Sequence, residues 1–149
     1  MGRHGPVQVS KLLVTKGSSV ATIPPGATVA DAVAELREHR IGALVVSSDH
    51  KHIEGIVSER DVVRALTDRA GALREDPVSS IMSSKVTTCS PDDEVESLMS
   101  TMTHMRFRHV PVVRDGVLCG IVSIGDVVKH RIVELEKDRN ELVDYINAR

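Results

Sequence analysis

The sequence predicts an α/β fold made of two copies of one unit, each running short strand, helix, strand, strand, helix, with a long helix at the C-terminal end. Residues 55–63 and 120–128 agree at seven of nine positions, which is dense enough to identify an internal repeat. Upstream, Val20 matches Val86 at a spacing of 66 residues, against 65 for the two nonapeptides. Apolar residues recur with strand and helix periods in the same order in both copies. The chain is therefore one unit written twice.

Start and stop signals place the elements of the first unit. Ser10 is expected to cap a short helix over residues 11–16, because a hydroxyl side chain can accept an early backbone N–H. Thr28-x-x-Asp31 opens a second helix with a capping-box pattern, and Ser58 opens the closing helix. Continuous apolar runs predict strands over residues 20–23, 43–46 and 53–57.

The second unit repeats this order after a polar linker over residues 68–76. A short helix over 77–82 precedes a strand over 85–88, and the strands at 109–113 and 117–122 form a hairpin closed by an Asp-Gly turn. Neither unit is large enough to bury both faces of three strands alone, so the two are expected to pack on each other.

The helices of both units are amphipathic. Apolar residues three and four positions apart build one face of each helix, and that face is expected to lie in the core. In the first unit this face is Val29, Ala32, Val33 and Leu36, and in the second it is Val95, Leu98, Met99 and Met102. The closing helix of the first unit carries Val62, Val63 and Leu66.

The last helix is longer than its counterpart and is predicted to run from residue 126 to about residue 147. Its apolar residues follow steps of four, three, seven and four, which is close to a heptad seam but short and broken. Two interpretations remain open: the helix lies on its own domain, or it faces a partner and leaves its charged side to solvent. The stripe consists of Val128, Ile132, Leu135, Leu142 and Ile146, with Arg139 interrupting it.

Composition restricts the classes of partner. The formal net charge of −2 provides no basic field for nucleic acid or an anionic membrane, and Phe107 and Tyr145 are the only aromatic residues for base stacking. No apolar run approaches the roughly 20 residues of a membrane span, and the first residues lack a signal-peptide pattern. We therefore expect a cytoplasmic protein that binds neither membranes nor nucleic acid, with Cys89 and Cys119 as buried thiols.

The repeated nonapeptide places a hydroxyl, two residues and a carboxylate where an apolar strand meets a helix. Ser58-x-x-Asp61 and Ser123-x-x-Asp126 fit a helix cap, in which the serine accepts a backbone N–H and the acid favours the positive helix end. The same groups suit a ligand, because a carboxylate accepts from two vicinal hydroxyls and the helix N-terminus donates to an anion. The two roles are compatible.

A tandem unit with Gly-Ile-Val-Ser-x-x-Asp closing each copy, and His-Val-Pro-Val-Val in the second, resembles a pair of CBS motifs, the family named after cystathionine beta-synthase. The resemblance implies a Bateman module of two pseudo-symmetric α/β halves. The first motif is expected over residues 7–69, the second over 77–133, and a C-terminal helical extension over 134–149. It also implies clefts between the halves that bind adenosine-containing nucleotides in related regulatory proteins.

The resemblance carries the binding roles onto matching residues. Asp61 and Asp126 are expected to hold ribose hydroxyls, and Arg108 with His109 resembles the basic pair that meets phosphate. In the first copy Gly42 and Ala43 stand where this pair would be, so the two clefts are not expected to be equivalent. The remaining candidates for phosphate, base or wall contacts are Lys16, Val20, Thr22, Ser58, Arg60, Val86, Thr88, Pro111 and Ser123.

These observations lead to a regulatory module that is not an enzyme. It is expected to need no cofactor, to bind AMP, ADP, ATP or NAD as a regulatory ligand, to form a homodimer, and to act on an unknown regulated protein. The alternative is a structural or dimerisation module with vestigial clefts. Catalysis is disfavoured because the seven histidines are scattered and no nucleophile or phosphate-loop motif is present.

Overall fold

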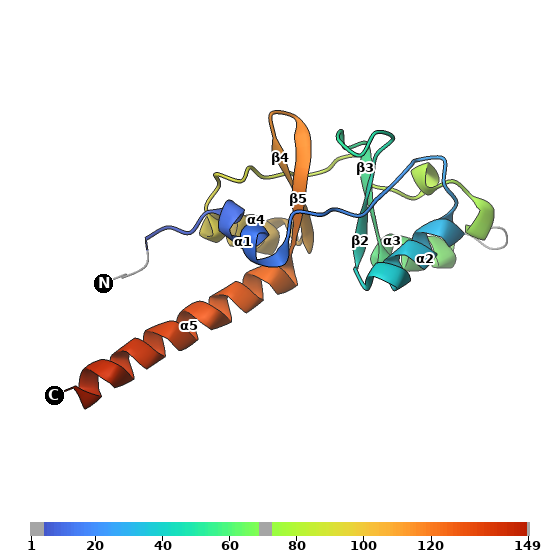
Figure 1. The fold of residues 1–149 in the computed structure, drawn as a ribbon. Coiled ribbons are helices and arrows are strands. Elements are labelled where there is room, and N and C mark those ends of the chain that lie inside the picture. Colours follow the sequence, from blue (N-terminus) through green and yellow to red (C-terminus); the bar gives the residue numbers. More distant parts are fainter. Residues whose placement is uncertain (1–4, 69–72, 149) are drawn as a thin grey trace.

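The computed structural model describes residues 5–68 and 73–148 and shows a mixed α/β protein in two halves (Figure 1). In the first part of the chain, the helices and strands follow the predicted order. The strand over residues 43–46 has its predicted bounds, whereas those predicted over 20–23 and 53–57 are shorter. Their bounds are α1 Val9–Lys16, β1 Thr22–Ile23, α2 Val29–His39, β2 Ala43–Val46, β3 Gly55–Ser58 and α3 Glu59–Asp68.

The second part of the chain repeats this order and ends in the longest helix (Figure 1). The short helix predicted over residues 77–82 is a single 3₁₀ turn, and part of the linker predicted over 68–76 lies outside the described residues. The elements are η1 Leu73–Glu75, η2 Val78–Ser80, α4 Val95–Met105, β4 His109–Arg114, β5 Val117–Ser123 and α5 Ile124–Asn147.

The two sheets share one plan, but the second is less complete. In the first sheet β1 lies parallel to β2 and β2 pairs antiparallel with β3, with Ile23 opposite Val46. In the second, β4 pairs with β5, and the strand predicted over residues 85–88 is reduced to one parallel bridge between Cys89 and Val112. Both members of this bridge lie 66 residues after Ile23 and Val46. The repeat therefore persists in the pairing, although no strand is formed.

Each half completes its core with a segment from the other part of the chain. Val9 and Leu12 of α1 pack in the core formed by α4, β4 and β5, whereas Val78 packs with β1, β2 and α2. Val9 N–H donates to Asp93 O at 2.8 Å, and Val78 N–H donates to Ala27 O at 2.7 Å. The unit of sequence repetition is thus not the unit of packing.

Capping chemistry explains most helix starts. The capping box of Thr28 and Asp31 is confirmed, and so are the caps at Ser58 and Ser123. The cap predicted at Ser10 is wrong: α1 begins at Val9, and Gln8 at the preceding position makes no side-chain cap. There the backbone N–H groups of Val9 and Ser10 instead donate to carbonyls of the second half, so tertiary pairing replaces the cap.

Val33, which the sequence predicts on the inward apolar face of its helix, lies at the surface, and so do two apolar residues of α3. Val33 is 44% exposed, and Val63 and Leu66 are 63% and 62% exposed. Each helix buries a narrower stripe than its sequence suggested, because a two-stranded or three-stranded sheet covers only part of a helix. In α2 that stripe is Val29, Ala32 and Leu36, which are all buried.

The β4–β5 hairpin confirms the predicted Asp-Gly turn. Asp115 and Gly116 both have positive φ, 52° and 78°, as expected for a type I′ turn, which matches the right-handed twist of the strands. Positive φ also ends α2 at Arg40 and α4 at Arg106, which occupy equivalent places in the two units.

The glycine that opens each nonapeptide allows a close approach between the halves' segments. A Cβ built at Gly55 would lie 2.6 Å from Met82 Sδ and 2.9 Å from Ser83 O, whereas one at Gly120 would meet only the Leu13 side chain, at 2.6 Å. A side chain can move aside, but the Ser83 carbonyl is fixed because it accepts from Ile56 N–H at 2.9 Å. Gly55 is therefore the more constrained of the two.

We expect Gly55→Ala to lower the free energy of unfolding by about 1–3 kcal/mol, as overpacking against a fixed backbone does. Gly120→Ala is the matched control and should cost less, because Leu13 can change its rotamer. Urea denaturation followed by circular dichroism measures both. Equal losses, or a larger loss at Gly120, would contradict this explanation.

Candidate functional site

Two equivalent helix starts carry the predicted carboxylates. Asp61 Oδ2 accepts from Ser58 N–H at 2.8 Å, and Asp61 N–H donates to Ser58 Oγ at 3.3 Å. Asp126 and Ser123 make the same bonds at 2.8 and 3.2 Å. In both units the strand ends at the serine and the helix begins at the next residue. The cap therefore positions each carboxylate at the edge of its sheet.

The Asp61 helix start opens into a cleft of about 360 Å³ between the two halves. The first half contributes the strand ends and the first turn of α3, and the second contributes the residues before Cys89 and those leading into β4. The cleft brings together six of the predicted residues, Ser58, Arg60, Asp61, Val86, Arg108 and His109.

Basic side chains dominate this cleft. Besides Arg60 and Arg108, the lining includes Arg64, Lys85 and Arg106, whereas Glu59 and Asp61 are its acidic members. The Asp61 side chain is only 14% exposed, and the guanidinium of Arg64 lies 3.9 Å from its Oδ1 atom. The cleft therefore combines one nearly buried carboxylate with an excess of positive charge, which suits a ligand that carries both hydroxyls and phosphate.

Sequence reasoning missed Arg64, Lys85 and Arg106 as members of the cleft. Arg64 lies one turn after Asp61, at the i+3 position that shares its helix face, and this spacing was a usable signal. Lys85 directly precedes the predicted Val86. Among neighbouring threonines, Thr87 lines the cleft, whereas the predicted Thr88 is exposed and is not among the lining residues.

The second helix start has a different environment. Lys16, at the end of α1, donates from Nζ to Asp126 Oδ2 at 2.5 Å and to Ile121 O at 2.7 Å. About a quarter of each side chain is exposed, 28% for Lys16 and 24% for Asp126. Partial burial alone would raise the pKa of Asp126, but the hydrogen bonds from Lys16 and Ser123 outweigh it and lower the pKa. The Lys16 ammonium is thus bound to Asp126, the carboxylate that is equivalent to Asp61 in the repeat.

The other predicted residues are not among those that line the Asp61 cleft. Thr22 Oγ1 is 2.5 Å from His50 Nδ1, so its hydroxyl is already engaged. Pro111 is buried in β4, and its carbonyl accepts from Cys89 N–H at 3.0 Å. Val20 is half-buried ahead of β1.

His109 lies between the two helix starts. A Cβ built at Gly42 would be 3.1 Å from its Cε1 and Nε2 atoms, so the ring covers the glycine of the other half. Burial lowers the pKa of His109, the nearby Lys16 lowers it further, and the charges of Asp126 and Glu59 only partly oppose this. The imidazole is therefore a neutral hydrogen-bonding group near pH 7.

The described residues contain neither a cluster of metal-binding side chains nor a membrane-spanning helix. Among them, no three His, Cys, Asp or Glu side chains gather where they could hold a metal ion, and no helix is long and apolar enough to span a bilayer. Cys89 and Cys119 are free and half-buried, and burial raises the pKa of Cys89 to about 12. That thiol is protonated at neutral pH.

Comparison with known proteins finds the same arrangement elsewhere. A family profile described as the CBS domain matches residues 9–68 and 78–133. The crystal structure of the CBS-domain containing protein ATU1752 from Agrobacterium tumefaciens has a TM-score of 0.81 and 42% identity, covering 84% of this chain and 99% of that one.

Two further relatives extend the comparison. The CBS domain protein PAE2072 from Pyrobaculum aerophilum, solved in complex with AMP, has a TM-score of 0.76 and 31% identity, covering 87% of this chain and 97% of that one. The mitochondrial CBS domain-containing protein CBSX3 of Arabidopsis thaliana is 37% identical over 125 residues, which are 81% of this chain and 61% of that protein. The profile matches both units, and the solved neighbours share their fold, so the chain belongs to the CBS-domain family, as two tandem CBS domains.

Proposed function

We propose that this protein is a regulatory module that binds an adenosine-containing nucleotide in the Asp61 cleft and transmits its occupancy to another protein chain. The observation that carries the proposal is the combination of one nearly buried carboxylate, a helix start and five basic side chains around about 360 Å³. A CBS-domain relative with 31% identity binds AMP, which supports the same class of ligand here.

Each part of such a nucleotide has a suitable group in the cleft. Asp61 Oδ1, the oxygen that makes no capping bond, can accept from the two ribose hydroxyls. The N-terminus of α3 and the guanidinium groups of Arg60 and Arg108 are suited to the phosphate. Val86 and Ile56 offer apolar contacts for the base. The volume lies near the lower end of small-molecule sites, which favours AMP or ADP over ATP and NAD.

The second helix start is proposed to bind no nucleotide as long as Lys16 holds Asp126. A ribose there would have to displace an ammonium at 2.5 Å, whereas in the Asp61 cleft it would have only a guanidinium at 3.9 Å to compete with. The alternative function, a structural module with vestigial clefts, is supported for this position alone. We therefore propose one nucleotide per chain.

Replacing each carboxylate in turn tests this assignment. Asp61→Ala and Asp126→Ala remove equivalent caps, but Asp126→Ala also removes the ion pair with Lys16 and should lose more stability without ligand. Only Asp61→Ala should lose binding, by at least tenfold in the dissociation constant for AMP, because the ribose loses its acceptor. Isothermal titration calorimetry with AMP, ADP, ATP and NAD measures affinity and stoichiometry.

The wild type should bind one nucleotide per chain, and Asp126→Ala should keep that site. A nucleotide at 100 times its dissociation constant would stabilise the wild type by about 2.7 kcal/mol in thermal unfolding. Failure of all four nucleotides to bind would overturn the proposed ligand class. Loss of binding in Asp126→Ala but not in Asp61→Ala would show that the nucleotide binds beside Asp126 and not in the Asp61 cleft.

The position of His109 between the helix starts predicts a pH dependence of stability. Its pKa is lower in the folded protein than its ordinary value of about 6.5, so the unfolded chain binds the proton more tightly. This contribution to stability is full above about pH 6.5 and is lost as the pH falls toward the folded pKa. The melting temperature of the wild type should fall as the pH is lowered from 7.5 to 5.5, and that of His109→Gln should fall less. An equal decline in both proteins would contradict the assignment.

A further inference from the structure

The long helix α5 exposes an apolar stripe that the other described residues do not cover. Val127 is its one buried residue in the described chain, and beyond it the helix extends away from both halves (Figure 1). Its 24 residues span about 36 Å at 1.5 Å per residue. The stripe residues are between 50% and 59% exposed, namely Val128, Ile132, Leu135, Leu142 and Ile146. The interpretation that this helix lies on its own domain is therefore wrong for the stripe.

The spacing of the stripe is that of a coiled-coil seam. Steps alternate between four and three residues from Val128 to Ile146, with Arg139 at the one charged position. In heptad terms, Val128, Leu135 and Leu142 are d positions, whereas Ile132, Arg139 and Ile146 are a positions. Such a seam is covered by another helix of the same kind.

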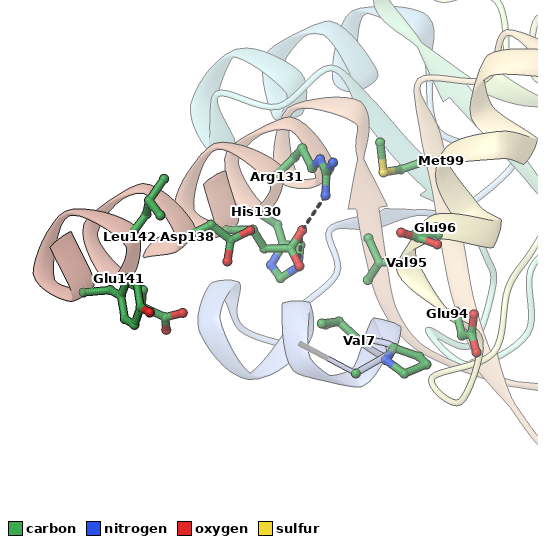
Figure 2. Close-up of a pocket in the computed structure, with 14 residues that line it drawn as sticks. Val7, Glu94, Val95, Glu96, Met99, His130, Arg131, Asp138, Glu141 and Leu142 are labelled. Atoms are coloured by element: carbon green, nitrogen blue, oxygen red, sulfur yellow. Dashed lines mark hydrogen bonds and ion pairs between the residues drawn. The ribbon is translucent and has the colours of Figure 1, made fainter. Parts of the chain in front are cut away.

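A groove beside the stripe shows which side of α5 is open. Figure 2 shows this groove, of about 940 Å³, between the outer part of α5, the start of α4 and residues 5–7. Arg131, Asp138 and Tyr145, the g positions of the heptads, line it. A helix lying along the seam would close the outer wall of this groove.

We propose that the occupant is α5 of a second copy of this chain, packed antiparallel along the seam. This inference deepens the homodimer expected of the regulatory module and does not require a nucleotide. The register places Ile132 against the partner's Leu135 and Arg139 against the partner's Val128, so that facing seam positions sum to 267 and the flanking charges lie within two residues of this level. The two apolar layers, formed by Ile132 and Leu135, lie at the centre, Arg139 lies in the layers outside them, and Leu142 meets Gly125 at the start of the partner's helix.

The flanking charges support this register. With it, Lys129 faces the partner's Glu136, and Arg131 faces the partner's Asp138, and the twofold axis repeats each pair. All four contacts join opposite charges. Within its own chain Arg131 contacts Glu134 at 3.3 Å, an exposed pair that can share its guanidinium. Exposed ion pairs contribute little affinity each, so their role is to select orientation, and the apolar layers supply most of the stability.

The parallel alternative has worse complementarity. It would place Arg139 directly against the partner's Arg139 in the middle of the seam, where two guanidinium groups would have to be desolvated together. Of the flanking positions, only Arg131 and the partner's Glu136 would join opposite charges. Leu142 would face the partner's Leu142, whereas in the antiparallel pair these two residues lie about 25 Å apart.

Analytical ultracentrifugation of the full chain tests the proposal. The wild type should show a reversible dimer of twice 16.2 kDa, and Ile132→Glu should weaken it by at least tenfold. Because Ile132 is exposed, circular dichroism and AMP titration should show that the variant still folds. A wild type that stays monomeric, or a dimer unaffected by Ile132→Glu, would overturn the proposal.

A charge exchange tests the orientation. Lys129→Glu and Glu136→Lys should each weaken the dimer by roughly tenfold, because each turns two attractions into repulsions. The double variant should restore wild-type affinity in the antiparallel pair only, since a parallel pair keeps Arg131 against the new lysine. Failure of this rescue, or a disulfide between copies of Leu142→Cys, would overturn the antiparallel register.

Nucleotide affinity of the same variants keeps the two proposals separate. AMP binding by a monomeric Ile132→Glu chain, together with the loss of its dimer, supports both. A dimer with the predicted charge dependence and no affinity for any nucleotide overturns the proposed ligand and leaves the α5 pairing intact.

Discussion

The exchange of short segments between the halves determines where everything else in this protein lies. Val9 and Leu12 are buried among residues that follow them by more than 80 positions, and Val78 is buried in the half that precedes it. Because each core is incomplete without the other part of the chain, the halves cannot separate without exposing apolar surface. The Asp61 cleft exists because this exchange brings residues 83–87 against the first turn of α3.

The same exchange makes two equivalent motifs chemically unequal. The segment that passes Asp126 is α1, which ends in Lys16 and pairs with the carboxylate. The segment that passes Asp61 is η2 and the residues after it, which approach Gly55 so closely that Ser83 O bonds to Ile56 N–H. Identical caps therefore face a lysine in one case and an open, basic cleft in the other. Internal repetition preserves backbone chemistry, whereas the passing segment decides whether a carboxylate is available.

Local chemistry made much of the fold predictable. The repeat, the capping boxes, the Asp-Gly turn and the buried strand at residues 43–46 all follow from interactions within a few residues of each other. The errors share a different cause. The cap at Ser10, the strand over residues 85–88 and the burial of Val33 depend on what packs there from elsewhere in the chain.

The candidate site shows the same difference between residues that a local motif indicates and residues that only tertiary packing brings together. The resemblance to CBS motifs indicated Asp61 and Arg108, which the cleft brings together from opposite halves. It carried no information about Lys85 or Arg106, because an exposed basic residue in a loop has no periodic signature. The pairing of Lys16 with Asp126 was equally hidden, since the two residues are 110 positions apart and only the exchanged α1 joins them.

One backbone hydrogen bond connects the cleft to the long helix. Arg108 lines the cleft, and its carbonyl accepts from the N–H of Ile124, the first residue of α5, at 2.8 Å. The equivalent bond in the first unit joins Gly42 O to Glu59 N–H at 3.0 Å. The first N–H of each helix therefore donates to the carbonyl of a residue that lines the cleft. A ligand group that binds the Arg108 side chain therefore contacts the residue whose carbonyl accepts from the first N–H of α5. Because a helix is stiff along its axis, a small rotation at Ile124 becomes a larger displacement at Leu142, where the proposed partner helix lies.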